Sequence, residues 1–114
     1  MHELSIAVSI VELAQEEAER LGGRVTAVHL RLGALCGVMK EALETSYEVA
    51  CADTPLQGSR LVIEELPVFV YCPRCEDERP IDSVQSFRCP KCGTATPDVR
   101  QGKEVQLVAM EIEE

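Results

Sequence analysis

Aromatic residues are scarce in this chain, which has no Trp, two Tyr and two Phe, together 4% of its residues. It therefore offers no platform of aromatic rings on which nucleic-acid bases could stack. Basic residues are also few, since 11 Lys plus Arg face 20 Asp plus Glu and the formal net charge is −9. Phosphate backbones are bound by Lys and Arg that replace condensed counterions. The composition argues against nucleic acid as a partner and predicts an aliphatic core.

Long apolar runs are missing as well. Residues 1–5 lack the positive charge that opens a signal peptide, and glutamates such as Glu12 and Glu16 interrupt the apolar positions that follow. The sequence thus predicts no membrane insertion and a cytoplasmic location. In a reducing compartment, six cysteines indicate metal or redox chemistry more than disulfide bonds.

What the chain does contain predicts a small folded protein, with 46% hydrophobic and 27% charged residues over 114 positions. Apolar residues recur at spacings of three and four over residues 4–21 and 38–51, which predicts two amphipathic helices. The first helix is expected to bury Leu4, Ala7, Val8, Val11, Ala14, Ala18 and Leu21. A period of two predicts strands over 24–32, 60–68 and 105–112.

A stretch of different character, residues 71–101, interrupts this pattern and holds four of the six cysteines and four of the six prolines. The predicted fold is α+β, with two helices packed on a three-stranded mixed β-sheet built from residues 1–70 and 102–114. The stretch 71–101 is predicted to be an inserted, zinc-ribbon-like subdomain with four cysteines.

The strongest motif is a doubled knuckle, Cys72-Pro73-Arg74-Cys75 and Cys89-Pro90-Lys91-Cys92-Gly93. Two thiolates separated by two residues can converge on one ion, and a second such pair completes a tetrahedron that suits zinc or iron. A closed four-thiolate site leaves no position for water or substrate, so this ion is expected to be structural. Disulfides or a redox pair are the alternative interpretation of the same cysteines.

A second candidate metal site lies at the N-terminus, in Met1-His2-Glu3. The α-amine of Met1, the backbone nitrogen and imidazole of His2, and the amide nitrogen of Glu3 can form adjoining chelate rings. Nitrogen ligands in a plane select Ni(II) or Cu(II) over Zn(II). The alternative is that His2 is an ordinary solvated terminal residue.

Three further residues invite a metal or redox role but have a simpler interpretation. Cys36 and Cys51 are expected to be buried or partly buried thiols outside the knuckles, because free cysteine behaves as a small hydrophobe. His29 is expected to be a satisfied residue on the polar face of a strand.

Together these elements resemble the hydrogenase maturation nickel metallochaperones of the HypA/HybF family. The resemblance covers essentially the whole chain and is carried by Met1-His2-Glu3-Leu4-Ser5, Leu32-Gly33-Ala34-Leu35-Cys36-Gly37-Val38, residues 54–61 and the two knuckles. Two departures are Glu76, where glycine is frequent, and Cys36, where many relatives resemble serine. Neither departure touches a proposed ligand.

The resemblance implies that His2 is the principal nickel ligand, helped by the Met1 amine and Glu3. It also implies that structural Zn(II) is held by Cys72, Cys75, Cys89 and Cys92. Ni(II) would then be a transferable cargo, delivered to the large subunit of [NiFe]-hydrogenase with the GTPase HypB as a partner. The resemblance leaves open whether the chain also supplies urease maturation proteins, as in some organisms. It also leaves open whether the chain forms a homodimer.

Two other classes of protein are alternatives to the nickel metallochaperone. A rubredoxin-like electron-transfer protein would hold iron in the same knuckles, and a zinc-ribbon adaptor would have no nickel function. An enzyme is not expected, because the sequence contains no nucleophile paired with a base, no glycine-rich phosphate loop and no paired-carboxylate site.

Overall fold

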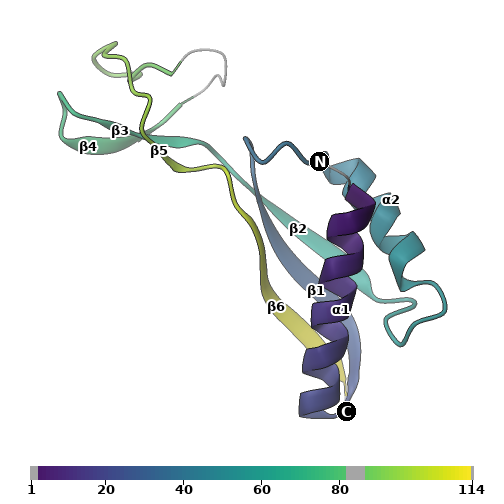
Figure 1. Ribbon diagram of the computed structural model, residues 1–114. Helices are drawn as coiled ribbons and strands as arrows, with labels where there is room; N and C mark the ends of the chain where they lie inside the picture. The colour runs from purple at the N-terminus through teal and green to yellow at the C-terminus, as the bar shows by residue number, and fades with distance from the viewer. Residues whose placement is uncertain (1–2, 82–86, 114) are drawn as a thin grey trace. The chain divides into compact units, whose positions relative to one another are not determined.

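The structure is a computed structural model that describes residues 3–81 and 87–113. Within these residues, two helices and six strands follow one another (Figure 1). In chain order they are α1 (Glu3–Leu21), β1 (Arg24–Gly33), α2 (Lys40–Cys51), β2 (Arg60–Leu66), β3 (Phe69–Cys72), β4 (Asp77–Pro80), β5 (Val99–Gln101) and β6 (Val105–Glu113). No helix within the described ranges is long and apolar enough to span a bilayer.

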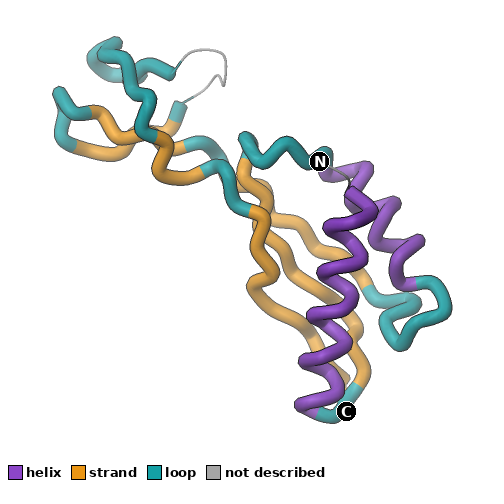
Figure 2. The backbone as a smooth tube through the Cα atoms, in the orientation of Figure 1, coloured by secondary structure: helices purple, strands orange, loops and turns teal. Residues whose placement is uncertain are grey.

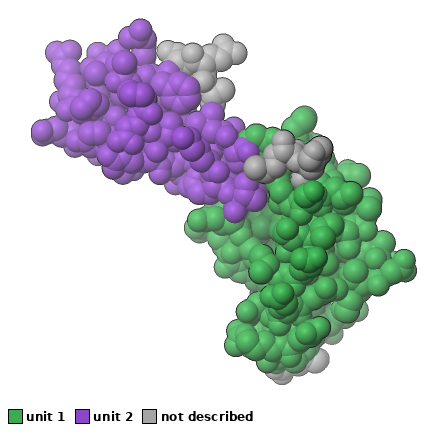
Figure 3. All heavy atoms as spheres, in the orientation of Figure 1, with its two compact units in different colours: residues 1–31, 37–64, 106–114 green, residues 32–36, 65–105 purple. Residues whose placement is uncertain are grey.

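The strands form two sheets, one with the order β2-β1-β6 and the other with the order β4-β3-β5. The chain divides into two compact units, coloured separately in Figure 3. The first unit contains residues 1–31, 37–64 and 106–114, and the second contains 32–36 and 65–105. The predicted subdomain 71–101 lies within the second unit.

The sheet β2-β1-β6 is mixed. The first residues of β1 line a common pocket with the residues just before β2, and near the other end Arg31 Nε lies 3.1 Å from Glu64 Oε1, so β1 and β2 run in the same direction. In contrast, Arg24 at the start of β1 reaches Glu113 at the end of β6, so β6 runs the opposite way. The predicted α+β fold with a mixed sheet is confirmed.

Both helices lie on one side of this sheet (Figure 2). The largest buried side chain is Tyr47 on α2, and apart from Cys51 the rest of this core is aliphatic as predicted. The core of the first unit consists of Ala7, Ile10, Val11, Ala14, Val25, Ala27, Val28, Leu30, Leu43, Tyr47, Cys51 and Leu56.

The predicted buried face of α1 was partly wrong. Leu4, Val8 and Leu21 are each 40% exposed or more, whereas Ile10 is buried. The periodicity placed the apolar stripe too broadly, because a helix against a sheet buries only the side chains at its line of contact. The helix ends as expected, with Gly22 at φ +72 and its N–H bonded to the Ala18 carbonyl at 2.8 Å.

The second predicted strand, 60–68, ends two residues earlier in the structure, and a separate strand follows it. β2 ends at Leu66 and β3 begins at Phe69, with Pro67 between them. Proline has no N–H to donate to a neighbouring strand, which favours a break in pairing at this point. The short strand β3 is the centre of the second sheet, pairing antiparallel with both β4 and β5.

Candidate metal centre

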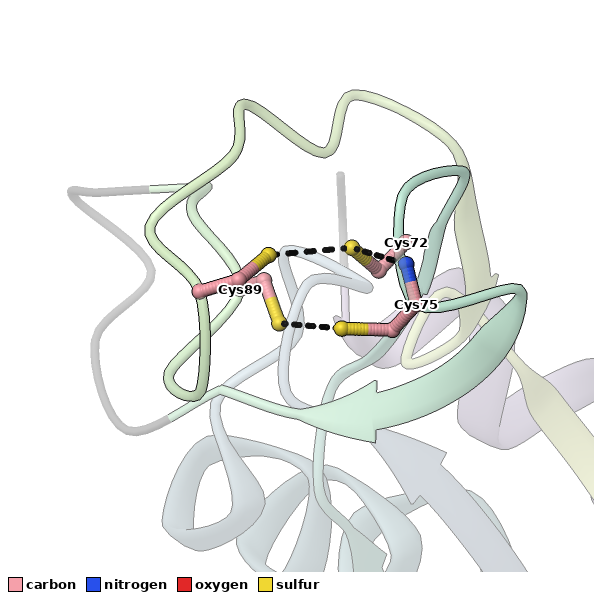
Figure 4. Close-up of side chains that lie close together, drawn as sticks. Cys72, Cys75 and Cys89 are labelled. Carbon is pink, nitrogen blue, oxygen red and sulfur yellow. Dashed lines mark hydrogen bonds between the residues drawn. The ribbon is translucent and has the colours of Figure 1, made fainter.

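Four cysteine side chains converge in the second unit (Figure 4). Cys72 closes β3 and Cys75 lies in the turn that follows, while Cys89 and Cys92 come from the second knuckle. Their four Sγ atoms all lie within 4.8 Å of one another. The structure therefore brings together all four cysteines that the doubled motif singled out.

The backbone folds each knuckle tightly around its sulfur atoms. The N–H of Cys75 donates to Cys72 Sγ at 3.4 Å, and Glu76 then takes a positive φ of 53° to turn the chain into β4. In the second knuckle, the N–H of Gly93 donates to the Cys89 carbonyl at 2.8 Å, with Gly93 at φ +75. Glycine adopts this left-handed conformation without the strain that a side chain would introduce.

The sulfur spacing fits a tetrahedral ion. Cys72 Sγ lies 3.5 Å from Cys92 Sγ, and Cys75 Sγ lies 3.9 Å from Cys89 Sγ. Zinc–sulfur bonds of about 2.3 Å place neighbouring thiolates of a tetrahedron roughly 3.8 Å apart. A disulfide requires a sulfur separation of about 2.05 Å, and all four cysteines are free thiols. The arrangement is that of a metal site and not of two disulfide bonds.

The surroundings of these thiols lower the pKa of Cys92 and of Cys89 and so favour their ionisation. Cys92 hydrogen-bonds to the Thr94 hydroxyl at 3.1 Å, and this bond together with the Thr94 backbone lowers the Cys92 pKa to about 6. By contrast, hydrogen bonds with the Cys92 and Cys72 sulfurs raise the pKa of Cys75 to about 11. A metal cation supplies the charge that a set of four crowded thiolates needs.

The four cysteines are buried to different extents. Cys72 and Cys89 are 0% and 2% exposed, whereas Cys75 and Cys92 are partly exposed. Around them the second unit buries Leu32, Val68, Val70 and Thr96 as well. Because this is a small apolar core, an ion held by four thiolates would supply much of the cohesion of the unit.

The predicted nickel ligands are placed only in part. Glu3 is the first residue of α1 and is partly exposed, whereas Met1 and His2 lie outside the described residues. The nickel set Met1, His2 and Glu3 therefore stays a prediction.

The remaining candidates have ordinary surroundings. His29 Nε2 lies 2.8 Å from Glu111 Oε2 on the neighbouring strand β6, which satisfies the imidazole. Cys51 is buried at the end of α2, 3.9 Å from Ser59 Oγ, and Cys36 is partly buried in the turn after β1. The expected burial of both thiols outside the knuckles is confirmed.

Sequence reasoning missed two residues next to the cysteine cluster. Thr94 follows Cys92 by two positions and hydrogen-bonds to its sulfur, and this short spacing could have drawn attention to it. Arg79 lies on β4, and nothing local in the sequence connects it to the cysteines. Its position depends on the pairing of β4 with β3.

The fold and this centre define a small α+β protein with one unit organised around a four-cysteine metal site. Along the sequence, residues 1–112 match the family described as "Hydrogenase/urease nickel incorporation, metallochaperone, hypA". The chain is 50% identical to hydrogenase maturation factor HypA of Roseiflexus sp. (strain RS-1), over 100% of this chain and 94% of that protein. It is 47% identical to the HypA of Chloroflexus aurantiacus (strain J-10-fl), over 97% of this chain and 98% of that protein.

Solved structures agree with the fold. The solution structure of the nickel metallochaperone HypA from Helicobacter pylori matches with a TM-score of 0.66 at 22% identity, over 98% of this chain and 97% of that one. A second solution structure of a HypA protein matches with a TM-score of 0.74, also at 22% identity, over 99% of this chain and 97% of that one. The chain belongs to the HypA family of nickel metallochaperones, which serve hydrogenase maturation. The family resemblance carried by the sequence motifs is confirmed.

Proposed function

We propose that this chain binds Ni(II) through the Met1 amine, His2 and Glu3 and delivers it to the large subunit of [NiFe]-hydrogenase. The observation that carries the proposal is the match of residues 1–112 to the nickel-incorporation family, because this span includes Met1-His2-Glu3. The chain acts as a carrier and not as an enzyme. The GTPase HypB and, where urease is made, urease maturation proteins are the further partners, in the cytoplasm.

Cys72, Cys75, Cys89 and Cys92 hold a structural Zn(II) in this proposal. Support comes from the sulfur separations of 3.5 and 3.9 Å, which suit a tetrahedral thiolate site. Four protein ligands fill the coordination sphere of zinc, so the ion has no open position at which to exchange with the cargo. A terminal site made of few ligands, in contrast, can both accept an ion and release it.

The acidic surface is suited to this carrier role. A formal charge of −9 attracts divalent cations and basic partner surfaces over long range, and it raises the rate of encounter more than it fixes the partner.

A transfer assay tests the proposal directly. Untagged chain loaded with one equivalent of Ni(II) is mixed with nickel-free hydrogenase large subunit, and nickel in the separated large subunit is measured by mass spectrometry. Transfer from the wild type and its loss in His2→Ala, with zinc content unchanged, is the expected result. Equal transfer from both proteins, or from free Ni(II) at the same concentration, would refute delivery through His2.

A further inference from the structure

Arg79 lies on the same face of the second sheet as one of the four cysteines. In the antiparallel pair β3–β4, Cys72 is opposite Asp77 and Val70 is opposite Arg79. Directly opposed residues share a face of the sheet, and so do residues two apart on one strand. The side chain of Arg79 is thus on the face that carries the Cys72 thiol.

The guanidinium of Arg79 is unusually enclosed for a charged group. Its side chain is only 25% exposed, and the Nε atom is buried with no hydrogen-bond partner among the described residues. Nη1 donates to Asp77 Oδ2 at 3.1 Å. This bond uses only one of the three nitrogens of the guanidinium. A buried, unpaired donor costs free energy unless a negative charge lies near it.

The negative groups near Arg79 are the Asp77 carboxylate and the cysteine thiolates. Burial alone would lower the pKa of Arg79, but the charges of Asp77, Cys75 and Cys89 raise it above its ordinary value. The face of the sheet that Arg79 shares with Cys72 puts the cation on the side of the sulfur cluster, and the raised pKa agrees with this position.

The net charge of the metal–thiolate centre explains why a nearby cation such as Arg79 matters. Four thiolates and one divalent cation leave a net charge of about −2 at the centre, partly enclosed by protein, where uncompensated charge is costly. Charge and hydrogen bonds supplied from outside the ligand set are known to tune the stability of metal sites.

We infer that Arg79 is a positioning residue of the four-cysteine centre, which offsets the negative charge of the metal–thiolate cluster and slows loss of the ion. This inference rests on the zinc part of the proposed function. The knuckles contain two other cations, Arg74 and Lys91, but both are exposed. Solvent and salt screen an exposed charge much more than a partly buried one, so these two residues cannot take the place of Arg79.

The test compares Arg79→Gln with a matched control, Arg74→Gln, which removes the same charge from within the first knuckle. Zinc loss from each loaded, full-length protein is followed by absorbance in excess 4-(2-pyridylazo)resorcinol. We expect Arg79→Gln to lose zinc at least fivefold faster than the wild type, and Arg74→Gln to stay within about twofold. Equal rates for the two variants would overturn the inference.

A third variant, Arg79→Lys, separates charge from packing. It retains the cation on a side chain of different shape, so it should recover most of the slow zinc loss. In the Co(II)-substituted proteins, the sulfur-to-cobalt charge-transfer band should shift in Arg79→Gln and return toward the wild-type position in Arg79→Lys. If Gln and Lys variants are equally fast, or if neither binds the metal, the role of Arg79 is in packing and the inference fails.

Failure of the zinc assignment would give a different result. In that case the wild-type protein itself would contain no stoichiometric zinc, whichever residue occupies position 79.

Discussion

Gly33 and Gly102 approach each other so closely that a Cβ atom on Gly33 would lie 2.1 Å from the carbonyl carbon and oxygen of Gly102. Two hydrogen bonds fix this approach, from Gly33 N–H to the Glu104 carbonyl at 2.8 Å and from Leu35 N–H to the Gly102 carbonyl at 2.6 Å. The end of β1 and the turn after it thereby belong to the second unit, together with the cysteine cluster. A side chain at position 33 has no space.

Gly33→Ala should therefore destabilise the protein by about 2 to 3 kcal/mol, because the obstacle is backbone that cannot rotate away. Urea unfolding of the zinc-loaded protein measures the loss. Gly58→Ala is the control, since a Cβ there meets nothing within 4 Å and only its φ of +88° is unfavourable. This control should lose about 1 kcal/mol. Equal losses in the two variants would show that the Gly33–Gly102 contact is relaxed in solution.

Replacing a knuckle cysteine should unfold the cysteine-bearing segment. In Cys75→Ala or Cys92→Ala, three thiolates no longer close the tetrahedron, and we expect loss of the ion and of ordered structure over about residues 71–101. The helices and the sheet β2-β1-β6 should persist, because their aliphatic core is separate. Elemental analysis and amide NMR spectra provide the measurement. Dispersed amide signals from this segment in metal-free protein would contradict the prediction.

The hydroxyl of Thr94 should support zinc retention. Thr94→Val keeps the shape of the side chain but removes the hydrogen bond to Cys92, so zinc loss to a chelator should be severalfold faster. Thr94→Ser keeps the hydroxyl and should behave like the wild type. Identical kinetics in Val and Ser variants would mean that the backbone of Thr94 alone supports the thiolate.

His2→Ala should abolish specific Ni(II) binding while leaving zinc and fold intact. A short N-terminal tag should do the same, because it converts the Met1 amine into an amide although the His2 imidazole is unchanged. His29→Ala is the control: His29 is paired with Glu111, and its replacement should leave nickel affinity within about threefold, or roughly 0.6 kcal/mol. Calorimetric titration measures all three proteins. Retained affinity in the tagged protein would keep the imidazole as a ligand and exclude the amine.

Nickel affinity should also decrease as the pH falls below about 6.5, the ordinary pKa of histidine, because protons compete for the imidazole and the amine. Titrations between about pH 5.5 and 8, a range that spans this pKa, provide the measurement. An affinity that does not change over this range would indicate carboxylate ligands instead.

Local sequence patterns were enough to predict most of the first unit and the cysteine cluster of the second. Helical and strand periodicity placed both helices and the strands β1, β2 and β6 to within a few residues, because these patterns depend on neighbouring side chains. Cys72, Cys75, Cys89 and Cys92 were found in the same way, since the geometry of each pair is encoded in its two-residue spacing.

Which distant residues meet depends on the tertiary structure. The pairing of β4 with β3 puts Arg79 on the face of Cys72, and the turn after β1 packs against Gly102. His29 finds Glu111 on another strand for the same reason. Such contacts depend on strand order and register, which long-range packing selects and which no local spacing in the sequence records.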